Sequence, residues 1–355
     1  MKVGIITYHR ANNFGAVLQC YALQEKLKAL GYEVSVIDYR QPFTELIYSP
    51  YRLDIVKKGL KSPRLLGGYL FKVFPTLFRR SKQYDSFRNK YLHCTRPIKN
   101  AMQMPQDIDV YLIGSDQMWS LHPTNNVIEP IFFGDFPRPK GSRLEGYAIS
   151  SNIKALHDIG ATYLTESANR FERLSFRERV VRDEVERMTG VHGDVVLDPT
   201  LLLNYDDWNL LTTKPPVKEP YLLTYFLSAD TDNVAFRTKV KAFAEKNSLK
   251  MVDVFKIAYS PIEFLNAVKY AKVVFAASFH ATAFSVLFRK NFYSFRSTDG
   301  RDIRYINLLN AIQMSDRVIS TDDIETLHLR DVNYSGSDRL LKLLREDSIQ
   351  YLQSL

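Results

Sequence analysis

The sequence predicts an α/β fold made of two units in tandem. Its 355 residues are 45% hydrophobic and 25% charged, which is typical of folded proteins, and the length corresponds to about two domains. Short β-rich runs alternate with segments of helical periodicity, an order that favours parallel βαβ units. The alternation breaks around residues 203–218, where Asn, Asp and the pair Pro215-Pro216 suit neither period.

The first domain is expected to span residues 1–204. A strand at 3–7 leads through a polar loop into a helix that starts at Ala16 and stops at Gly31, and a second strand follows. The further elements predicted here are strands at 33–38, 110–113, 146–150, 174–176 and 195–197, with helices near 160–173 and 178–189.

The second domain is expected to span residues 205–355. Its predicted strands are 221–226, 251–255, 273–276 and 292–295, with helices near 232–246, 261–269 and 281–288 between and after them. A last helix near 336–352 can pack on either domain.

Positive charge is concentrated in one segment. The net charge is 48 − 39 = +9, but residues 51–100 hold 13 Lys and Arg against two Asp, which leaves 35 basic and 37 acidic groups elsewhere. This segment has the pattern of a basic amphipathic helix broken near Pro63 and 67–68, which favours contact with an anionic membrane surface. Packing on its own domain stays open. Because no RNA-binding signature accompanies the segment, we expect no nucleic-acid partner.

The chemistry-bearing residues exclude several classes of protein. Cys20 and Cys94 lack the spacing of a zinc site, and no Asp/His cluster has metal spacing, so we expect neither a metal nor a resident cofactor. Cys20 is expected to be buried. The first apolar run is too short for a signal peptide and no stretch approaches the roughly 20 apolar residues of a membrane span, so a cytoplasmic location is expected.

The glycine-rich loops of NAD enzymes and P-loop proteins are absent from the sequence, which disfavours both classes. Open α/β sheets bind ligands at the carboxyl ends of their strands. After the first strand, Asn13 and Gly15 open a helix whose N–H groups can bind an anion or a sugar hydroxyl, although Asn13 can equally be a plain cap. After another strand come Asp116, Gln117 and Trp119, either a carboxylate with an aromatic platform for a sugar or a cap with a core residue.

Two later strand ends carry groups suited to anions and proton transfer. Arg177 emerges where a strand gives way to a helix and can fork onto a carboxylate or phosphate. Ser278 and Phe279 precede His280 at another strand end, and a histidine is the natural proton donor or acceptor near neutral pH. A surface role for the charges near Arg177 and a core role for His280 remain as alternatives.

Together these segments resemble the polysaccharide pyruvyl transferase family from about residue 2 to residue 309. The resemblance is specific because five motifs recur in the family's order, at residues 7–19, 113–119, 175–179, 197–202 and 278–282. It implies two Rossmann-like domains facing a cleft, as in glycosyltransferase-B proteins. It also implies transfer of the enolpyruvyl unit of phosphoenolpyruvate, a co-substrate, onto a sugar diol as a cyclic ketal.

The resemblance assigns roles to individual residues. Arg177 would hold the carboxylate or phosphate of phosphoenolpyruvate, and His280 would be the acid that protonates its methylene carbon. Asp116 is our candidate base, from its position at a strand end and not from the family. The acceptor would be a hexose such as galactose, offering its 4- and 6-hydroxyls, on a lipid carrier at the inner face of the cell membrane.

One departure from the family pattern concerns the fourth strand end. Many members have Arg-x-His followed by Gly, where this chain has Ser278-Phe279-His280-Ala281. Arg301 and Arg304 are candidates for the missing cation, or they are surface charges. Two other functions stay open: a nucleotide-sugar glycosyltransferase of the same form, and a non-enzymatic adaptor that uses residues 51–100.

Overall fold

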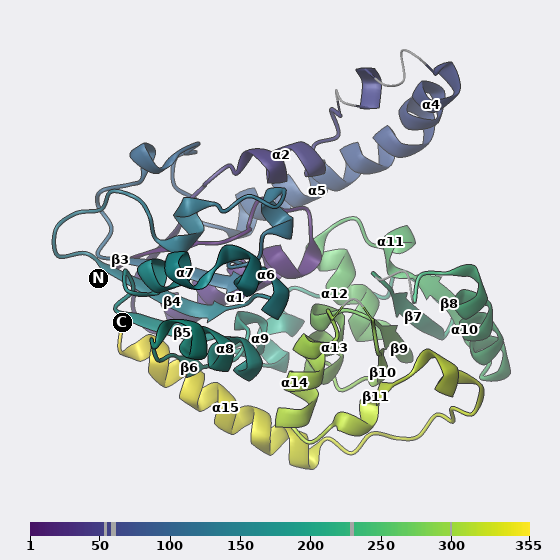
Figure 1. Ribbon diagram of the computed structural model, residues 1–355. Coiled ribbons are helices and arrows are strands. Elements are labelled where there is room, and N and C mark those ends of the chain that lie inside the picture. Colours follow the sequence, from purple (N-terminus) through teal and green to yellow (C-terminus); the bar gives the residue numbers. More distant parts are fainter. Residues whose placement is uncertain (53–54, 58–61, 228–230, 299) are drawn as a thin grey trace. The chain divides into compact units, whose positions relative to one another are not determined.

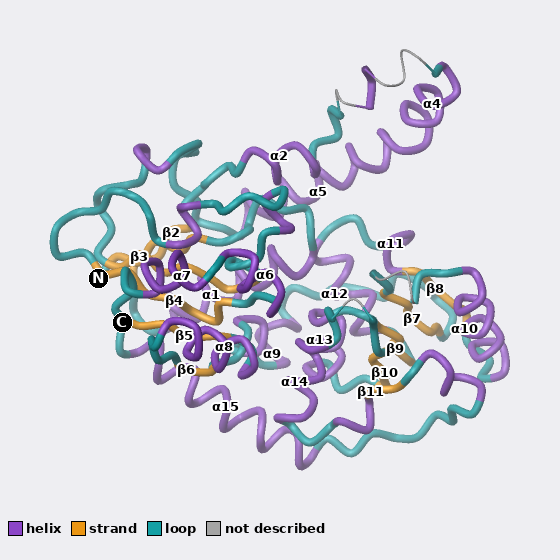
Figure 2. The backbone as a smooth tube through the Cα atoms, viewed as in Figure 1, coloured by secondary structure: helices purple, strands orange, loops and turns teal. Residues whose placement is uncertain are grey.

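The computed structural model describes residues 1–52, 55–57, 62–227, 231–298 and 300–355. The chain forms two compact units. The first comprises Met1–Phe176, Val180–Asp194 and Leu355, and the second comprises Arg177–Arg179 and Val195–Ser354. The predicted boundary was 204/205, and the observed division places residues 195–204 in the second unit. Figure 1 labels the elements, and Figure 2 shows the strands of the two sheets in orange.

The first unit is built on a six-stranded sheet of order β2-β1-β3-β4-β5-β6, in which β1 to β5 pair in parallel. The strands are β1 (Lys2–Ile6), β2 (Glu33–Val36), β3 (Val110–Asp116), β4 (Arg143–Ile149), β5 (Arg173–Phe176) and β6 (Asp194–Val195). Because β2 and β3 lie on opposite sides of β1, the order reverses between β1 and β3. In open α/β sheets this reversal is where ligands bind.

Helices connect these strands. They are α1 (Phe14–Ala29), α2 (Pro42–Tyr48), α4 (Pro63–Gly68), α5 (Phe74–Tyr91), α6 (Ile153–Ile159), α7 (Ala161–Ala168) and α8 (Arg179–Thr189). Short 3₁₀ turns lie at Ala101–Gln103, His122–Thr124 and Pro130–Phe133. The core between sheet and helices is rich in buried aromatic and aliphatic side chains, with Trp119 stacked on Phe133 at 5.6 Å.

The second unit has a five-stranded parallel sheet of order β11-β10-β9-β7-β8. Its strands are β7 (Tyr221–Tyr225), β8 (Lys250–Asp253), β9 (Val273–Ala276), β10 (Asn291–Phe295) and β11 (Val318–Ile319). Its helices are α9 (Tyr205–Asn209), α10 (Val234–Lys246), α11 (Val254–Ile257), α12 (Pro261–Tyr270), α13 (Phe279–Leu287), α14 (Ile303–Ala311) and α15 (Ser335–Gln353), with 3₁₀ turns at Pro199–Leu201, Ser315–Arg317 and Thr321–Glu325. The strand order reverses between β7 and β9.

The last helix, α15, belongs to the second unit and is hydrogen-bonded within it. The Ser348 hydroxyl accepts from the Leu197 N–H at 2.9 Å, and Arg345 Nε donates to the Leu201 carbonyl at 2.7 Å. These bonds tie the end of the chain to residues 195–204. The two partners of α15, Leu197 and Leu201, lie on the segment that also carries Asp198.

The basic segment forms a helical arm of the first unit. α4, a π-helical stretch at Tyr69–Val73 and α5 follow one another, and in Figure 1 they project away from the sheet. Residues 53–54 and 58–61 of the predicted amphipathic pattern lie outside the described residues. Among the helices that the structure describes, none is long and apolar enough to cross a membrane.

The predicted α/β fold with two parallel sheets is confirmed. The helices α2 and α6 and the two-residue strand β11 were not predicted, because each is too short to establish a period.

Candidate functional site

Three residues that each follow a strand in the chain lie together in the second unit. Arg177 follows β5, Asp198 follows β6 and precedes the 3₁₀ turn Pro199–Leu201, and His280 lies in the first turn of α13 after β9. Asp198 suits its position because its carboxylate accepts the Thr200 N–H at 2.9 Å and caps the turn that Pro199 begins. The sequence therefore places an acid, a base and a guanidinium at neighbouring turns.

The Asp198 carboxylate joins the other two groups. Its Oδ2 accepts from Arg177 Nη1 at 2.8 Å and lies 3.7 Å from His280 Nε2. Its Oδ1 accepts from the Thr200 hydroxyl at 2.7 Å. The predicted pair of Arg177 and His280 thus meets on one carboxylate oxygen.

Arg177 is held on two further sides. Its Nε donates to Glu178 Oε1 at 2.8 Å, and its guanidinium lies over the Phe279 ring, 4.4 Å from the centroid. The arginine side chain is 2% exposed and that of Asp198 is fully buried, whereas that of His280 keeps 11% exposure. The imidazole therefore has the largest exposed fraction of the three side chains, although its Nε2 atom is buried.

Electrostatics fix the charge of the buried carboxylate. Burial alone would raise the pKa of Asp198, but His280, Arg177 and the Thr200 hydroxyl hold that pKa well below its usual range. Asp198 is therefore ionised at neutral pH. Arg177 contacts the carboxylates of both Glu178 and Asp198, so its guanidinium is already paired inside the cluster and is not a bare receptor for an anion.

Ser278 and Phe279 position the histidine. Ser278 occupies the N-cap of α13, where its backbone is extended, and Phe279 is 4% exposed. The Phe279 and His280 rings meet edge to face at 5.1 Å. Ser278 and Phe279, the two residues predicted beside His280, thus lie directly before it in the chain. The Phe279 ring contacts both the imidazole and the Arg177 guanidinium.

The two candidate replacement cations lie at the start of α14. Arg301 is exposed, and its Nη1 donates to the Leu227 carbonyl at 3.5 Å, just past the end of β7. Arg304 lies inside the first turn of α14, and its Nε donates to the Arg301 carbonyl at 3.3 Å. Because Ala277 at the end of β9 donates to Tyr225 at the end of β7, Arg301 reaches the strand end next to the one that carries His280.

In the first unit, the ends of β1 and β3 are joined by a buried network. The Thr7 hydroxyl donates to the Ser115 carbonyl at 2.9 Å and accepts from Gln19 Nε2 at 2.8 Å. Asn13 is the N-cap of α1, with its side-chain oxygen on the N–H groups of Gly15 and Ala16. Those two N–H groups bind the Asn13 side chain instead of a ligand. Of the two roles open for Asn13 and Gly15, ligand binding and helix capping, the structure shows capping.

Asp116 ends β3 in a special conformation. Its φ is 84°, in the left-handed region, and a Cβ on Gly114 would lie 2.0 Å from the Tyr147 carbonyl oxygen, so only glycine fits two residues earlier. The half-buried Asp116 carboxylate accepts the Gln117 N–H at 2.9 Å. Burial, with a further contribution from the charge of Asp116, raises the pKa of Tyr8 and of Tyr48.

Trp119 does not form a platform for a sugar. It is 0% exposed, its Nε1 donates to the Phe132 carbonyl at 3.2 Å, and its ring stacks on Phe133. A ring closed on all sides has no face for a ligand. The prediction of Trp119 as a binding residue is corrected to a core residue, because the strand-end turn directs the indole inward.

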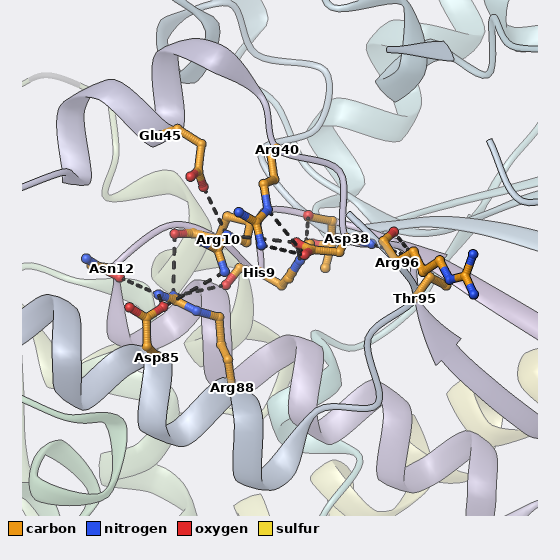
Figure 3. A network of polar contacts seen from close by, with 11 residues as sticks. His9, Arg10, Asn12, Asp38, Arg40, Glu45, Asp85, Arg88, Thr95 and Arg96 are labelled. Carbon is orange, nitrogen blue, oxygen red and sulfur yellow. Dashed lines mark hydrogen bonds and ion pairs between the residues drawn. The ribbon is translucent and has the colours of Figure 1, made fainter. Parts of the chain in front are cut away.

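Sequence reasoning did not assign a role to Asp198 or Glu178, although Asp198 is the centre of the cluster. The signal was present, since Asp198 lies in the motif at residues 197–202 and stands before a proline after a strand. A second cluster was also missed: His9, Arg10 and Arg40 around Asp38 at the ends of β1 and β2 (Figure 3). No group of three or more His, Cys, Asp or Glu with metal-site geometry occurs within the described part of the chain.

The family model for polysaccharide pyruvyl transferases matches residues 13–299. The match covers most of the chain. This chain belongs to the polysaccharide pyruvyl transferase family. Membership indicates a transferase of polysaccharide biosynthesis with a pyruvyl donor and a sugar acceptor.

The chain is also similar to solved structures at low sequence identity. One is a putative UDP-N-acetylglucosamine 2-epimerase from Listeria monocytogenes, with 10% identity, a TM-score of 0.47 and coverage of 99% of this chain and 90% of that one. A UDP-N-acetylglucosamine 2-epimerase from Rickettsia bellii has 8% identity, a TM-score of 0.48 and coverage of 100% and 96%. The spinosyn rhamnosyltransferase SpnG has 10% identity, a TM-score of 0.40 and coverage of 99% and 96%. No curated protein matches the chain.

Proposed function

We propose that this pyruvyl transferase uses phosphoenolpyruvate as its donor and a sugar diol as its acceptor, forms a cyclic ketal and releases phosphate. The observation that carries the proposal is the buried Arg177, Asp198 and His280 cluster within a chain of this family. The diol would be the 4- and 6-hydroxyls of a galactose-type hexose in a polysaccharide precursor.

His280 supplies the proton in this proposal. The ionised Asp198 stabilises the imidazolium, which gives its proton to the methylene carbon of phosphoenolpyruvate and leaves the adjacent carbon cationic. One sugar hydroxyl attacks that carbon, phosphate departs and the second hydroxyl closes the ring. Of the two hydroxyl protons, one restores the imidazolium and the other leaves on phosphate or with a base, so atoms and charges balance.

Two further residues complete the proposed chemistry. Arg301 is our choice for the phosphate contact because its guanidinium reaches the end of β7, beside the strand that leads to His280. Asp116 is our choice for the base, because it is half-buried at the end of β3, beside the β1/β3 reversal. Arg177 then acts as a positioning residue that holds the Asp198 carboxylate and the Phe279 ring in place.

The decisive experiment measures product formation. Purified protein is incubated with phosphoenolpyruvate and synthetic galactosides, and phosphate release and the carboxyethylidene ketal are followed by colorimetry and mass spectrometry. Parallel reactions with UDP-sugars test the glycosyltransferase alternative. Absence of both phosphate and ketal across the acceptor panel, with glycosyl transfer from a UDP-sugar, would contradict the proposal.

The helical arm is the proposed contact with the membrane. Phe71 is 84% exposed, and Leu70 and Val73 are 44% and 45% exposed, while Lys72 and Arg79 nearby are exposed cations. Apolar side chains flanked by basic ones suit the boundary between headgroups and acyl chains of an anionic bilayer. Such docking would bring the enzyme to a lipid-linked acceptor.

Vesicle sedimentation tests this contact. Binding to phosphatidylglycerol vesicles is compared with binding to phosphatidylcholine vesicles. At roughly 1 kcal/mol per basic residue, replacing Arg64, Lys72 and Arg79 by Gln should weaken binding by about 100-fold. Phe71→Ser should also weaken binding, whereas Val234→Ser, at an equally exposed position of the second unit, should not. Equal binding of all variants would overturn the docking proposal.

A further inference from the structure

A cavity of about 310 Å³ lies in the first unit at the base of the helical arm. Three segments form it: the loop after β1, the end of α2 with the residues that follow, and one face of α5. On α5 the lining residues are spaced by three or four, so a single helix face closes the cavity. Its volume is at the lower end of the range for small-molecule sites.

The polar wall is held by ion pairs, most of which Figure 3 shows. Arg10 Nε donates to Glu45 Oε1 at 2.9 Å, and Arg10 Nη1 lies 3.9 Å from Asp85 Oδ1. Arg88 Nη2 donates to Asp85 at 2.8 Å and to Asn12 Oδ1 at 3.0 Å. These bonds connect all three segments, so the polar groups of the cavity are fixed before any ligand arrives.

The charge of this wall favours an uncharged ligand. Both guanidinium groups already face carboxylates, and the lining carries three basic and two acidic side chains, with Lys82 as the third cation. A phosphate dianion would meet Glu45 and Asp85 at close range. A hydroxyl both donates and accepts, so an array of hydroxyls matches a wall of alternating carboxylates and guanidinium groups.

One buried donor in the wall lacks an acceptor. Arg88 is 4% exposed, and within the described residues no hydrogen-bond acceptor meets its Nε–H. A buried polar group left unpaired costs free energy. Aromatic side chains line the same cavity, and Tyr51 keeps 64% of its surface exposed. An exposed ring beside hydroxyl partners is suited to the apolar C–H face of a pyranose.

We propose that this cavity binds an uncharged pyranose unit of the acceptor glycan. Naming the glycan as the acceptor rests on the proposed function, whereas the binding of a neutral sugar does not. Tyr48 connects the two, because it lines the cavity and packs against the core cluster that includes Met118 and Trp119, which follow Asp116 in the chain. The cavity therefore lies near the strand end that carries the candidate base.

The test is a binding measurement without phosphoenolpyruvate. Methyl glycosides of galactose, glucose and mannose are titrated against the full-length protein, and binding is followed by saturation-transfer NMR. Ser81→Trp fills the cavity from α5 without removing an ion pair and should weaken binding by tenfold or more. Its control is Ser86→Trp, an exposed position on the same helix, which should bind as the wild type does.

A second pair of variants keeps the proposal testable if Ser81→Trp fails to fold. Tyr51→Ala should weaken binding by about tenfold, the typical loss for one aromatic contact, and Tyr205→Ala, an exposed tyrosine of the second unit, should not. Inorganic phosphate and phosphatidylglycerol vesicles serve as anion probes.

Each outcome decides. If Ser81→Trp or Tyr51→Ala reduces sugar binding, the cavity proposal is supported. If no phosphate is released from phosphoenolpyruvate, only the proposed reaction is overturned. Sugar binding that both variants leave unchanged, no sugar binding at all, or phosphate displacing the sugar from the wild type would overturn the cavity proposal, while ketal formation would leave the reaction standing.

Discussion

The two units each carry a histidine beside an aspartate and an arginine at strand ends, but the two clusters differ in access. In the first unit His9 Nε2 lies 3.1 Å from Asp38 Oδ1, and Nδ1 faces the Thr7 carbonyl at 3.2 Å. His9 is 0% exposed, so both ring nitrogens are enclosed. His280 stands farther from its aspartate and keeps an exposed edge. Identical residue types thus give a fully enclosed cross-link in one unit and, in the other, a histidine whose ring is partly exposed.

The electrostatics follow the same division. Burial lowers the pKa of His9, whereas Asp38 and the Thr7 carbonyl, the two oxygen partners of its ring, act in the opposite direction. Burial raises the pKa of Asp38, yet His9, Arg10 and Arg40 bring it down to about 2. Asp38 is therefore ionised at neutral pH, and the enclosed first cluster serves stability. Exposure, rather than composition, marks the second cluster as the candidate for chemistry.

The largest expected effect separates the two histidines. His280→Ala should lower the rate of ketal formation by about 100- to 10,000-fold, the range for loss of a general acid, with little change in the far-UV circular dichroism spectrum. His9→Gln should leave kcat near the wild-type value but reduce the free energy of unfolding by about 1–3 kcal/mol, because buried oxygens lose their partner. His157→Ala, at a half-exposed position, is the neutral control. If His9→Gln were inactive and His280→Ala active, the chemistry would belong to the first cluster and not to the second.

The next effect concerns the two aspartates. Asp198→Asn should destabilise the second unit by about 3–5 kcal/mol, because Arg177 stays buried with half of its compensation removed. Asp38→Asn should cost the first unit less, about 1–3 kcal/mol, since its partner Arg40 is 37% exposed and solvent compensates that charge.

The two tryptophans allow each unit to be measured separately. Trp119 is buried in the first unit and Trp208 in the second, where its Nε1 donates to the Thr200 carbonyl at 3.0 Å. Urea unfolding of Asp38→Asn is therefore followed in a Trp208→Phe background, and that of Asp198→Asn in a Trp119→Phe background. Equal losses in the two units would contradict the difference in solvent access.

Part of this comparison was predictable from the sequence and part was not. The β-rich runs and helical periods were sufficient to predict two parallel sheets. The positions after strands singled out Arg177 and His280, and the resemblance to the family paired them. Their meeting point, Asp198, was not predicted because a carboxylate before a proline is usually a plain cap. The second role of Asp198, as the partner of both Arg177 and His280, depends on contacts between residues far apart in the chain. A local sequence pattern does not predict such contacts.

The Trp119 error has a related cause. An indole just after a strand can point to solvent or to the core, and the sequence does not distinguish these directions. The left-handed backbone of Asp116, three residues earlier, sets the direction of the turn that buries the ring. The cavity at the base of the arm was also beyond sequence reasoning, because its walls come from three segments separated by about 27 residues or more.

Acid titration sharpens the comparison further. The folded pKa of Asp38 is about 2, below its ordinary value near 3.9, so its contribution to stability is complete above about pH 5 and is lost as the pH falls through 2. At neutral pH this contribution is about 2.5 kcal/mol. The difference in unfolding free energy between the Trp208→Phe background and its Asp38→Asn derivative should therefore shrink between pH 5 and about 2. A difference that is constant over this interval would show that Asp38 acts by shape and not by charge.

The smallest expected effects come from replacing the arginines by lysine. Arg177 spans two carboxylates, with Nε on Glu178 and Nη1 on Asp198, and a single ammonium cannot bond to both at once. Arg177→Lys should cost the second unit about 1.5–3 kcal/mol, the worth of one hydrogen bond to a charged group. Arg40→Lys should change the first unit by no more than about 0.5 kcal/mol, because Arg40 directs both of its bonds to Asp38 Oδ2 in a solvent-accessible setting. Both are measured by urea unfolding in the single-tryptophan backgrounds, with ketal formation assayed beside them. Should Arg177→Lys lower kcat while stability is unchanged, the guanidinium would contact phosphoenolpyruvate itself, and its part would change from positioning Asp198 to binding the donor.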